Sequence, residues 1–217
     1  DVFEDLGKDS GKYEYILPSI NYKNNLAYFD DFGSIDHSIK AKYKNYDSNV
    51  NEGNIINDFN WNSNNFYSNS GLISKFESTI KNNNYHAKES ANLKNNKNVA
   101  ELATAIGYTT YYPLEKKTDT YEKILTPKFM LRYAPGGMRD LSNSQLRLTT
   151  ENLFSLNKLN NDDVIEDGAS ISVGSEYAYN NTINKAKNFK MSLGQVFNLE
   201  ENLDMPTQSS LNNRSSE

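Results

Sequence analysis

The sequence contains no cysteine and two histidines, His37 and His86. Without cysteine the segment has no disulfide, no zinc–thiolate site and no thiol nucleophile. The two histidines are isolated from each other and from any carboxylate cluster at ligand spacing, so we expect neither a metal site nor a His-based triad. The sequence also lacks a Gly-x-Ser-x-Gly elbow, a phosphate-binding loop and paired carboxylates near a histidine. We therefore expect no catalysis and no cofactor.

Long hydrophobic runs are missing as well. No stretch approaches the ~18 consecutive apolar residues of a membrane-spanning helix. The hydrophobic share is 36%, and the mean hydropathy is −0.78. A net charge of −5 leaves no basic stripe for nucleic acid, which we do not expect as a partner. Yet 15 tyrosines and 10 phenylalanines are too many for a disordered chain, and together with abundant asparagine they favour strands joined by polar turns.

The ends of the chain carry no targeting signal or closing element. Residues 1–5 (DVFED) are acidic where a signal peptide has a basic region, and residues 209–217 form a polar tract. The sequence therefore predicts either a cytosolic protein or an internal fragment, and the polar end favours the fragment.

Strict alternation of apolar and polar residues dominates the sequence. In residues 35–44, an apolar row that includes Ile39 opposes a row with Lys40, Lys42 and Lys44, which indicates a strand with one wet face. The same pattern recurs in residues 16–23, 55–62, 72–81, 102–112, 128–133, 171–179 and 189–197. Strands of about nine to twelve residues exceed the ~5–6 typical of soluble sheets and match the ~9–11 of membrane-spanning β-strands.

Clusters of Asn, Asp and Gly predict turns between these strands. They lie at residues 24–25, 30–33, 62–71, 82–84, 135–137 and 180–181. Residues 100–106 could begin a helix, but the alternating tail at residues 108–112 favours a strand. Aromatic residues gather near strand ends, which is typical of the girdles of outer-membrane barrels, although tyrosine also suits strands of any kind.

A loop and the strand after it carry a family signature. The signature residues are Asn152, Leu153, Phe154, Ser155, Asn157, Asp163, Glu166, Gly168 and Gly174. This pattern resembles the LptD (OstA) family of lipopolysaccharide-assembly outer-membrane proteins. Further matches follow in the family's order, including residues 17–22, 112–114, 125–135 and 194–197, so the resemblance covers residues 17–197.

The loop departs from the family pattern at three places. Lys158 and Val164 stand where the family usually has arginine, and Asn160-Asn161 replaces a usual Ser/Pro-Gly pair. The loop is therefore less basic than in relatives, which weakens any assignment of sugar or phosphate binding to those positions.

The resemblance implies an all-β fold: residues 1–217 would be an antiparallel up-and-down meander, the central segment of a large transmembrane β-barrel in the cell outer membrane. Apolar faces would meet outer-membrane lipids, and the Lys/Asn/Glu faces would line a wet lumen. The implied function is insertion of lipopolysaccharide into the outer leaflet, without enzymatic activity. Implied partners are lipopolysaccharide, an LptE-like lipoprotein plug and an LptA-like periplasmic bridge, reached through a jellyroll domain outside this chain.

Two local sites have alternative interpretations. The row Lys40, Lys42 and Lys44 could guide phosphorylated headgroups through the lumen, or could be an ordinary solvated face. The acidic residues Asp162, Asp163, Glu166 and Asp167 could bind a divalent cation, or could belong to a solvated loop that caps the strand beginning at Gly168.

For the whole segment, the rival functions are another outer-membrane barrel (a porin, a receptor or a barrel enzyme) and a soluble β-rich, adhesin-like domain.

Overall fold

The computed structural model describes residues 2–4, 13–46, 50–90, 93–184, 188–209 and 215–216, and every regular element among them is a β-strand. The strands are β1 (Val2–Glu4), β2 (Tyr13–Phe29), β3 (Gly33–Tyr46), β4 (Asn51–Asn62), β5 (Phe66–Tyr67), β6 (Ile73–Lys88), β7 (Asn98–Tyr111), β8 (Leu114–Lys117), β9 (Tyr121–Ala134), β10 (Gly168–Asn181), β11 (Phe189–Asn198) and β12 (Ser215–Ser216). The predicted all-β class is confirmed.

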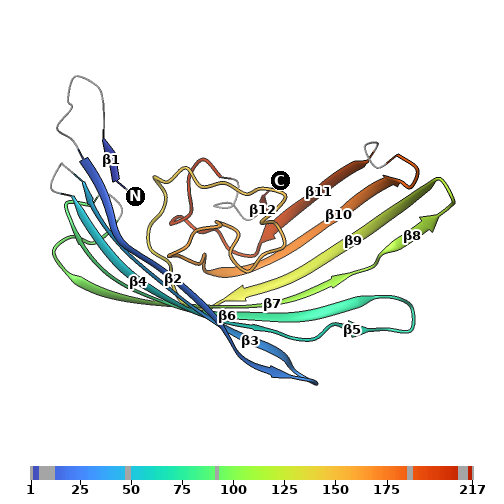
Figure 1. The fold of residues 1–217 in the computed structure, drawn as a ribbon, viewed down its shortest axis with the longest axis horizontal. Helices are drawn as coiled ribbons and strands as arrows, with labels where there is room; N and C mark the ends of the chain where they lie inside the picture. Colours follow the sequence, from blue (N-terminus) through green and yellow to red (C-terminus); the bar gives the residue numbers. More distant parts are fainter. Residues whose placement is uncertain are drawn as a thin grey trace.

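The strands form one antiparallel meander. Its order is β1-β2-β3-β4-β6-β7-β9-β10-β11-β12, with β5 attached to β6 and β8 attached to β9. Pairing is continuous between most neighbouring strands. For example, β9 and β10 pair without a break from Ala134↔Gly168 to Tyr121↔Asn181. The sheet is open, and it curves into a trough whose hollow holds residues 135–167 and 199–209 (Figure 1).

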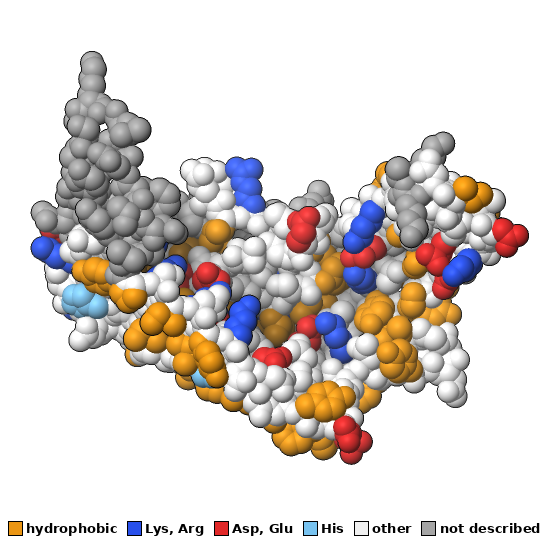
Figure 2. Space-filling model, in the orientation of Figure 1, with side chains coloured by type: hydrophobic (Ala, Val, Ile, Leu, Met, Phe, Trp, Pro, Cys, Tyr) orange, Lys and Arg blue, Asp and Glu red, His pale blue; other side chains and the backbone are white. Residues whose placement is uncertain are grey.

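The two faces of the trough differ in chemistry, as the alternation predicts. Large apolar side chains stay exposed on the convex face, among them Ile55, Phe59, Ile80, Leu102, Ile106, Leu131, Val173, Met191 and Leu193. Figure 2 shows hydrophobic side chains gathered along the lower, convex edge. Burial of alternate residues on the other face is clearest at the end of β6, where Tyr85 and Ala87 are buried between exposed neighbours.

Three predicted turns are wrong. Residues 24–25 lie within β2, residues 82–84 lie within β6, and residues 180–181 are the last two residues of β10. At the first two places an asparagine side chain bonds across to the neighbouring strand: Asn25 Nδ2 donates to Asp36 Oδ1 at 2.9 Å, and Asn82 Nδ2 donates to the Glu101 carbonyl at 3.4 Å. Asparagine favours turns because its side chain can hydrogen-bond to its own nearby backbone. Here the side chain bonds to the neighbouring strand instead, so the backbone stays extended.

The other predicted elements follow the structure more closely. Residues 30–32 form the turn between β2 and β3, and Gly33, the first residue of β3, has a φ of +89°; a Cβ there would stand 2.0 Å from the Asn62 carbonyl oxygen. Residues 100–106 belong to strand β7 rather than to a helix. Among the described residues, no helix is long and apolar enough to cross a membrane.

The strand β7 is only partly paired with β9. Residues Ile106–Tyr111 pair with β9, Pro113 interrupts the chain, and β8 continues the pairing along the same neighbour. Because β9 ends at Ala134, the first half of β7 has no strand partner on that side among the described residues. The chain leaves the sheet at this point and turns into the trough.

Candidate functional site: a loop packed in the trough

Residues 135–167, here called the inner loop, connect β9 to β10 and pack on the concave face of the sheet (Figure 1). Their apolar side chains form a small core with the wall and with residues 199–209. The core members are Leu141, Leu153, Leu159, Val164, Val196 and Met205. A second cluster joins Ile165 of the loop to Ala105 and Ala134 of the wall. The expectation of a solvated loop is therefore not met, since the loop buries its own hydrophobic face.

Three apolar side chains of the inner loop rest on three glycines of the wall. A Cβ added to Gly194 would stand 2.9 Å from Leu153 Cδ2, and one added to Gly174 would stand 3.0 Å from Phe154 Cζ. A Cβ on Gly107 would stand 2.8 Å from Leu156 Cδ2. Glycines from β11, β10 and β7 thus leave the space into which consecutive parts of the loop fit.

Charged side chains are buried where the loop meets β9 and β10. The side chains of Arg132 and Lys158 are each 1% exposed, and that of Glu166 is 6% exposed. Arg132 Nη2 lies 3.4 Å from Glu166 Oε1, and Lys158 Nζ lies 3.8 Å from the same oxygen. Glu166 also accepts hydrogen bonds from the Lys158 amide at 2.9 and 3.1 Å. One carboxylate therefore holds two cations and a backbone donor.

Further hydrogen bonds fix these cations. Arg132 Nε donates to the Leu156 carbonyl at 2.6 Å, and its Nη2 donates to the Glu166 carbonyl. Lys158 Nζ donates to Ser170 Oγ at 2.9 Å. Burial, followed by the repulsion of Arg132, lowers the pKa of the Lys158 amine from 10.5 to about 7, although Glu166 opposes the change.

The signature residues at the start of the loop build its turns. Asn152 Oδ1 accepts a hydrogen bond from the Thr149 amide at 2.7 Å, and Ser155 Oγ accepts one from the Asn157 amide at 3.0 Å. Asn157 Nδ2 donates to the carbonyls of Asn161 and Val164 at 2.7 and 3.0 Å. These bonds close the segment that carries Lys158. Gly168, with a φ of +93°, then begins β10.

Three of the four predicted cation ligands, Asp162, Asp163 and Glu166, are paired with cations of the protein, and the fourth, Asp167, accepts a hydrogen bond from Asn202 Nδ2. Asp162 forms an ion pair with Lys40, and Asp163 Oδ2 accepts a hydrogen bond from Arg139 Nη2 at 2.8 Å. The hydrogen bond from Lys40, together with the charges of Lys40, Lys42 and Lys81, lowers the pKa of the Asp162 carboxyl despite its burial. Among the described residues, no group of three or more His, Cys, Asp or Glu is placed to hold a metal ion.

The predicted basic row lies on the concave side of β3. Lys40 reaches the loop through Asp162, whereas Lys42 and Lys44 line a cavity of about 530 Å³ that Arg139 and Asn161 also line. Lys81 of β6 adds a further tie, donating to the Asp162 carbonyl at 2.7 Å while pairing with Asp58 at 2.6 Å. Lys40 thus contacts the loop directly, and Lys42 and Lys44 face the loop across this cavity.

Sequence reasoning gave no site role to Arg132, Arg139, Gly107 or Gly194, although residues 194–197 were among the family matches. Arg132 did carry a signal, since it lies between Met130 and Ala134 on the inward face of a strand. The many apolar residues of the loop were a second signal, because large apolar side chains are mostly buried and so indicate a packed loop rather than a solvated one.

The family model LptD, described as LPS transport system D, matches residues 3–217. The chain belongs to the LptD family. No curated protein matches it. LptD proteins are outer-membrane proteins of lipopolysaccharide transport, so this chain has a role in that transport, and its open all-β meander fits a part of a β-barrel.

Proposed function

We propose that residues 1–217 form part of the wall of an LptD barrel through which lipopolysaccharide reaches the outer leaflet. The observation that carries the proposal is the contrast between the two faces of one curved sheet. The convex face exposes Ile80, Leu131 and Leu193, which suit lipid, while the concave face carries charged and polar residues. The LptD match supports the same assignment.

The inner loop has a defined place in this proposal. It occupies the hollow of the sheet and is held there by the glycine contacts and by the buried Arg132, Lys158 and Glu166. The signature residues from Asn152 to Gly174 then serve to seat the loop against the wall. The loop lies against the Lys40, Lys42 and Lys44 row, because Asp162 pairs with Lys40, and it therefore narrows the hollow of the sheet.

The remaining partners belong to the same proposal. An LptE-like plug and an LptA-like bridge would contact parts of the parent protein, the bridge through a domain outside this chain. A porin or receptor would share the alternating strands, but the LptD match favours transport. A soluble adhesin-like domain would have to cover the exposed convex face by packing it against a second sheet.

The test uses the full-length parent in cells that depend on it. The parent is replaced by a version without residues 135–167, joined through a short Gly-Ser linker, or by a version without the whole segment. We expect both to reduce lipopolysaccharide at the cell surface and to leave it behind in the periplasm, with the parent's level in the outer membrane measured in parallel. Normal surface lipopolysaccharide without the whole segment would refute the wall assignment, and normal display without the loop alone would refute its role.

A further inference from the structure

Two lysines lie side by side on the convex face of the sheet, at the end of β9 away from the inner loop (Figure 1). Lys116 of β8 and Lys123 of β9 are directly opposite each other in an antiparallel ladder, so their side chains project from the same face. That face is the convex one, because Met130 and Ala134 are buried on the concave face and lie an odd number of positions further along β9.

Neither lysine of this pair has a counter-ion of its own. Lys116 and Lys123 form no ion pair within the part of the chain that the structure describes, and Asp119 in the turn between them is no exception. Lys117, the next residue on β8, faces the other way and lies 3.7 Å from Glu122. Like charges directly opposite each other in a ladder are destabilising, so the pair favours an anion between its two amines.

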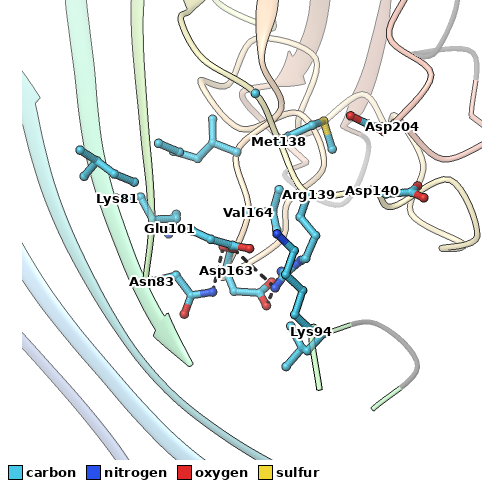
Figure 3. A pocket seen from close by; sticks show the side chains of 15 residues that line it. Lys81, Asn83, Lys94, Glu101, Met138, Arg139, Asp140, Asp163, Val164 and Asp204 are labelled. Atoms are coloured by element: carbon cyan, nitrogen blue, oxygen red, sulfur yellow. Dashed lines mark hydrogen bonds and ion pairs between the residues drawn. The ribbon is translucent and has the colours of Figure 1, made fainter. Parts of the chain in front are cut away.

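Cations on the concave face have different surroundings. Lys190 of β11 lies 3.8 Å from Glu176. Arg139 of the inner loop lies 3.6 Å from Glu101 and 2.8 Å from Asp163 (Figure 3). These carboxylates stand on the concave side, and the neighbouring convex positions of β9 and β10 carry none. The anion that complements the lysine pair must therefore come from outside the described chain.

An aromatic group holds one of the two amines in place. The rings of Tyr121 and Tyr179 stack with their centroids 5.9 Å apart. Lys123 Nζ lies 4.9 Å from the centroid of Tyr121 and 6.0 Å from that of Tyr179. A cation is attracted to the face of an aromatic ring, which restricts the motion of the Lys123 amine. Tyrosine and lysine together at the end of a strand are typical of the boundary between lipid and water.

The lysine pair begins where the apolar row of β9 ends. From position 125 to position 133, the convex side chains of β9 are all apolar or aromatic: Leu125, Pro127, Phe129, Leu131 and Tyr133. These nine residues match the ~9–11 that a β-strand needs to cross the hydrocarbon layer. Lys123 occupies the next convex position, so it lies at the level of the lipid headgroups.

The connections at the two ends of β9 indicate which side of the membrane this is. At the end with Lys123, residues 118–120 form a short turn from β8, whereas the inner loop of residues 135–167 leaves the other end. Outer-membrane barrels have short turns on the periplasmic side and longer loops outside. The lysine pair therefore lies at the inner leaflet, opposite the leaflet that receives lipopolysaccharide.

We propose that Lys116 and Lys123 bind the phosphate of an anionic glycerophospholipid at the periplasmic boundary. Both amines donate hydrogen bonds to the phosphate oxygens, and the acyl chains lie along the apolar convex row of β9. The inference rests on the proposed barrel wall, whose convex face meets lipid, and adds a site for one class of lipid to that face.

Native mass spectrometry of the full-length parent in detergent measures the binding. The probe is phosphatidylglycerol, titrated against the unaltered parent and against the double variant Lys116→Gln/Lys123→Gln. Glutamine removes both charges and keeps side chains of similar shape. We expect about tenfold or more weaker binding, because each lysine beside an anionic lipid surface contributes about fivefold. Unchanged binding by the double variant would overturn the proposal.

The matched control is the double variant Lys117→Gln/Lys190→Gln. Both lysines are exposed at the same rim, but they belong to the concave face and are paired with Glu122 and Glu176. The net charge changes by the same amount as before, so binding of phosphatidylglycerol should match that of the unaltered parent. If this control weakens binding equally, total charge explains the effect, and the proposed site is wrong.

Thermal unfolding separates loss of the site from loss of the fold. Without added lipid, Lys116→Gln/Lys123→Gln should be at least as stable as the parent, because it removes two like charges that face each other. Phosphatidylglycerol should then raise the Tm of the parent, since a ligand stabilises the folded state that binds it, and should leave the Tm of the double variant almost unchanged. An equal rise in both proteins would refute the site.

Two further lipids test the chemistry and the leaflet. Phosphatidylcholine, which has no net charge, should bind the parent and the lysine double variant equally; stronger binding to the parent would contradict recognition of an anionic lipid. Purified lipopolysaccharide should not displace phosphatidylglycerol from the parent, and displacement would place the pair at the outer leaflet. If the double variant keeps its phosphatidylglycerol while deletion of residues 1–217 still abolishes surface lipopolysaccharide, the lipid site fails and the transport function stands.

Discussion

Phe154 of the inner loop lies against the bare backbone of Gly174 in strand β10. A Cβ at Gly174 would stand 3.0 Å from Phe154 Cζ and 2.5 Å from the Leu193 carbonyl oxygen of the next strand. Both residues belong to the family signature, at positions twenty residues apart in the sequence. This contact explains why the signature contains both residues: the Phe154 ring packs where a side chain at position 174 would otherwise lie.

Gly174→Ala should loosen the inner loop. Overpacking of this kind costs about 1–3 kcal/mol, because the neighbouring backbone must move to admit the methyl group. The readout is the labelling rate of a cysteine placed at Ser172, which is 1% exposed on the same strand. This segment has no other cysteine, so peptide mapping assigns the label. Labelling should quicken about fivefold or more, following the change in opening free energy.

Gly137→Ala provides the control for that experiment. A Cβ at Gly137 meets nothing within 4 Å, so the substitution should leave the labelling rate unchanged. If Gly137→Ala and Gly174→Ala have the same effect, the close approach of Phe154 has no energetic consequence.

The buried group of Arg132, Lys158 and Glu166 should respond unequally to removal of its members. Glu166→Gln leaves the buried Arg132 guanidinium without its carboxylate, which should destabilise the loop by about 3–5 kcal/mol. Lys158→Met keeps the Arg132–Glu166 pair and replaces a buried amine with an apolar chain of similar length, so the effect should be near neutral or stabilising. Chemical unfolding of the detergent-solubilised parent compares the two. A larger loss from Lys158→Met than from Glu166→Gln would contradict this account.

Lys158 also predicts a pH dependence. Its pKa is about 7 in the folded loop and 10.5 in an exposed chain, so between these values the opened loop binds more protons than the packed one. Stability of the packed loop should therefore rise as the pH increases above about 7, by at most ~1.4 kcal/mol per pH unit. As the pH rises above about 7, the labelling rate of the Ser172→Cys variant, corrected for thiol ionisation, should therefore fall. The same rate measured in the Ser172→Cys/Lys158→Met double variant should not fall in this way. Parallel pH profiles in both backgrounds would count against a neutral buried amine.

Much of the sheet was predictable from local pattern. The alternation at residues 35–44 fixes which side chains of β3 face the trough, and residues 189–197 match β11 within a residue at its end. Turn chemistry was less reliable, because the side chain of Asn82 hydrogen-bonds to the neighbouring strand, and composition does not distinguish such a bond from a turn bond.

The inner loop escaped sequence reasoning for a different reason. Its apolar residues follow no period, so nothing in the local pattern shows that Leu153, Phe154 and Leu156 point at one surface. Their partners Gly194, Gly174 and Gly107 lie on three strands that the meander brings together. Such contacts depend on the register of the sheet, which the sequence does not state.

Adjacent residues on β11 should respond in opposite ways to the same charge. Leu193 is 58% exposed on the convex face near the middle of the strand, whereas Ser192 faces the trough. If the convex face meets lipid, Leu193→Lys should cost about 2–4 kcal/mol near the bilayer midplane, and Ser192→Lys should cost close to nothing. Refolding of the full-length parent into lipid vesicles, followed by urea titration, measures both. Equal losses of stability would refute the assignment of faces, and a loss for Ser192→Lys alone would place lipid on the concave side. The exposed apolar side chains of the convex face, such as Ile55, Ile80 and Leu193, argue that Leu193→Lys is the variant that loses stability.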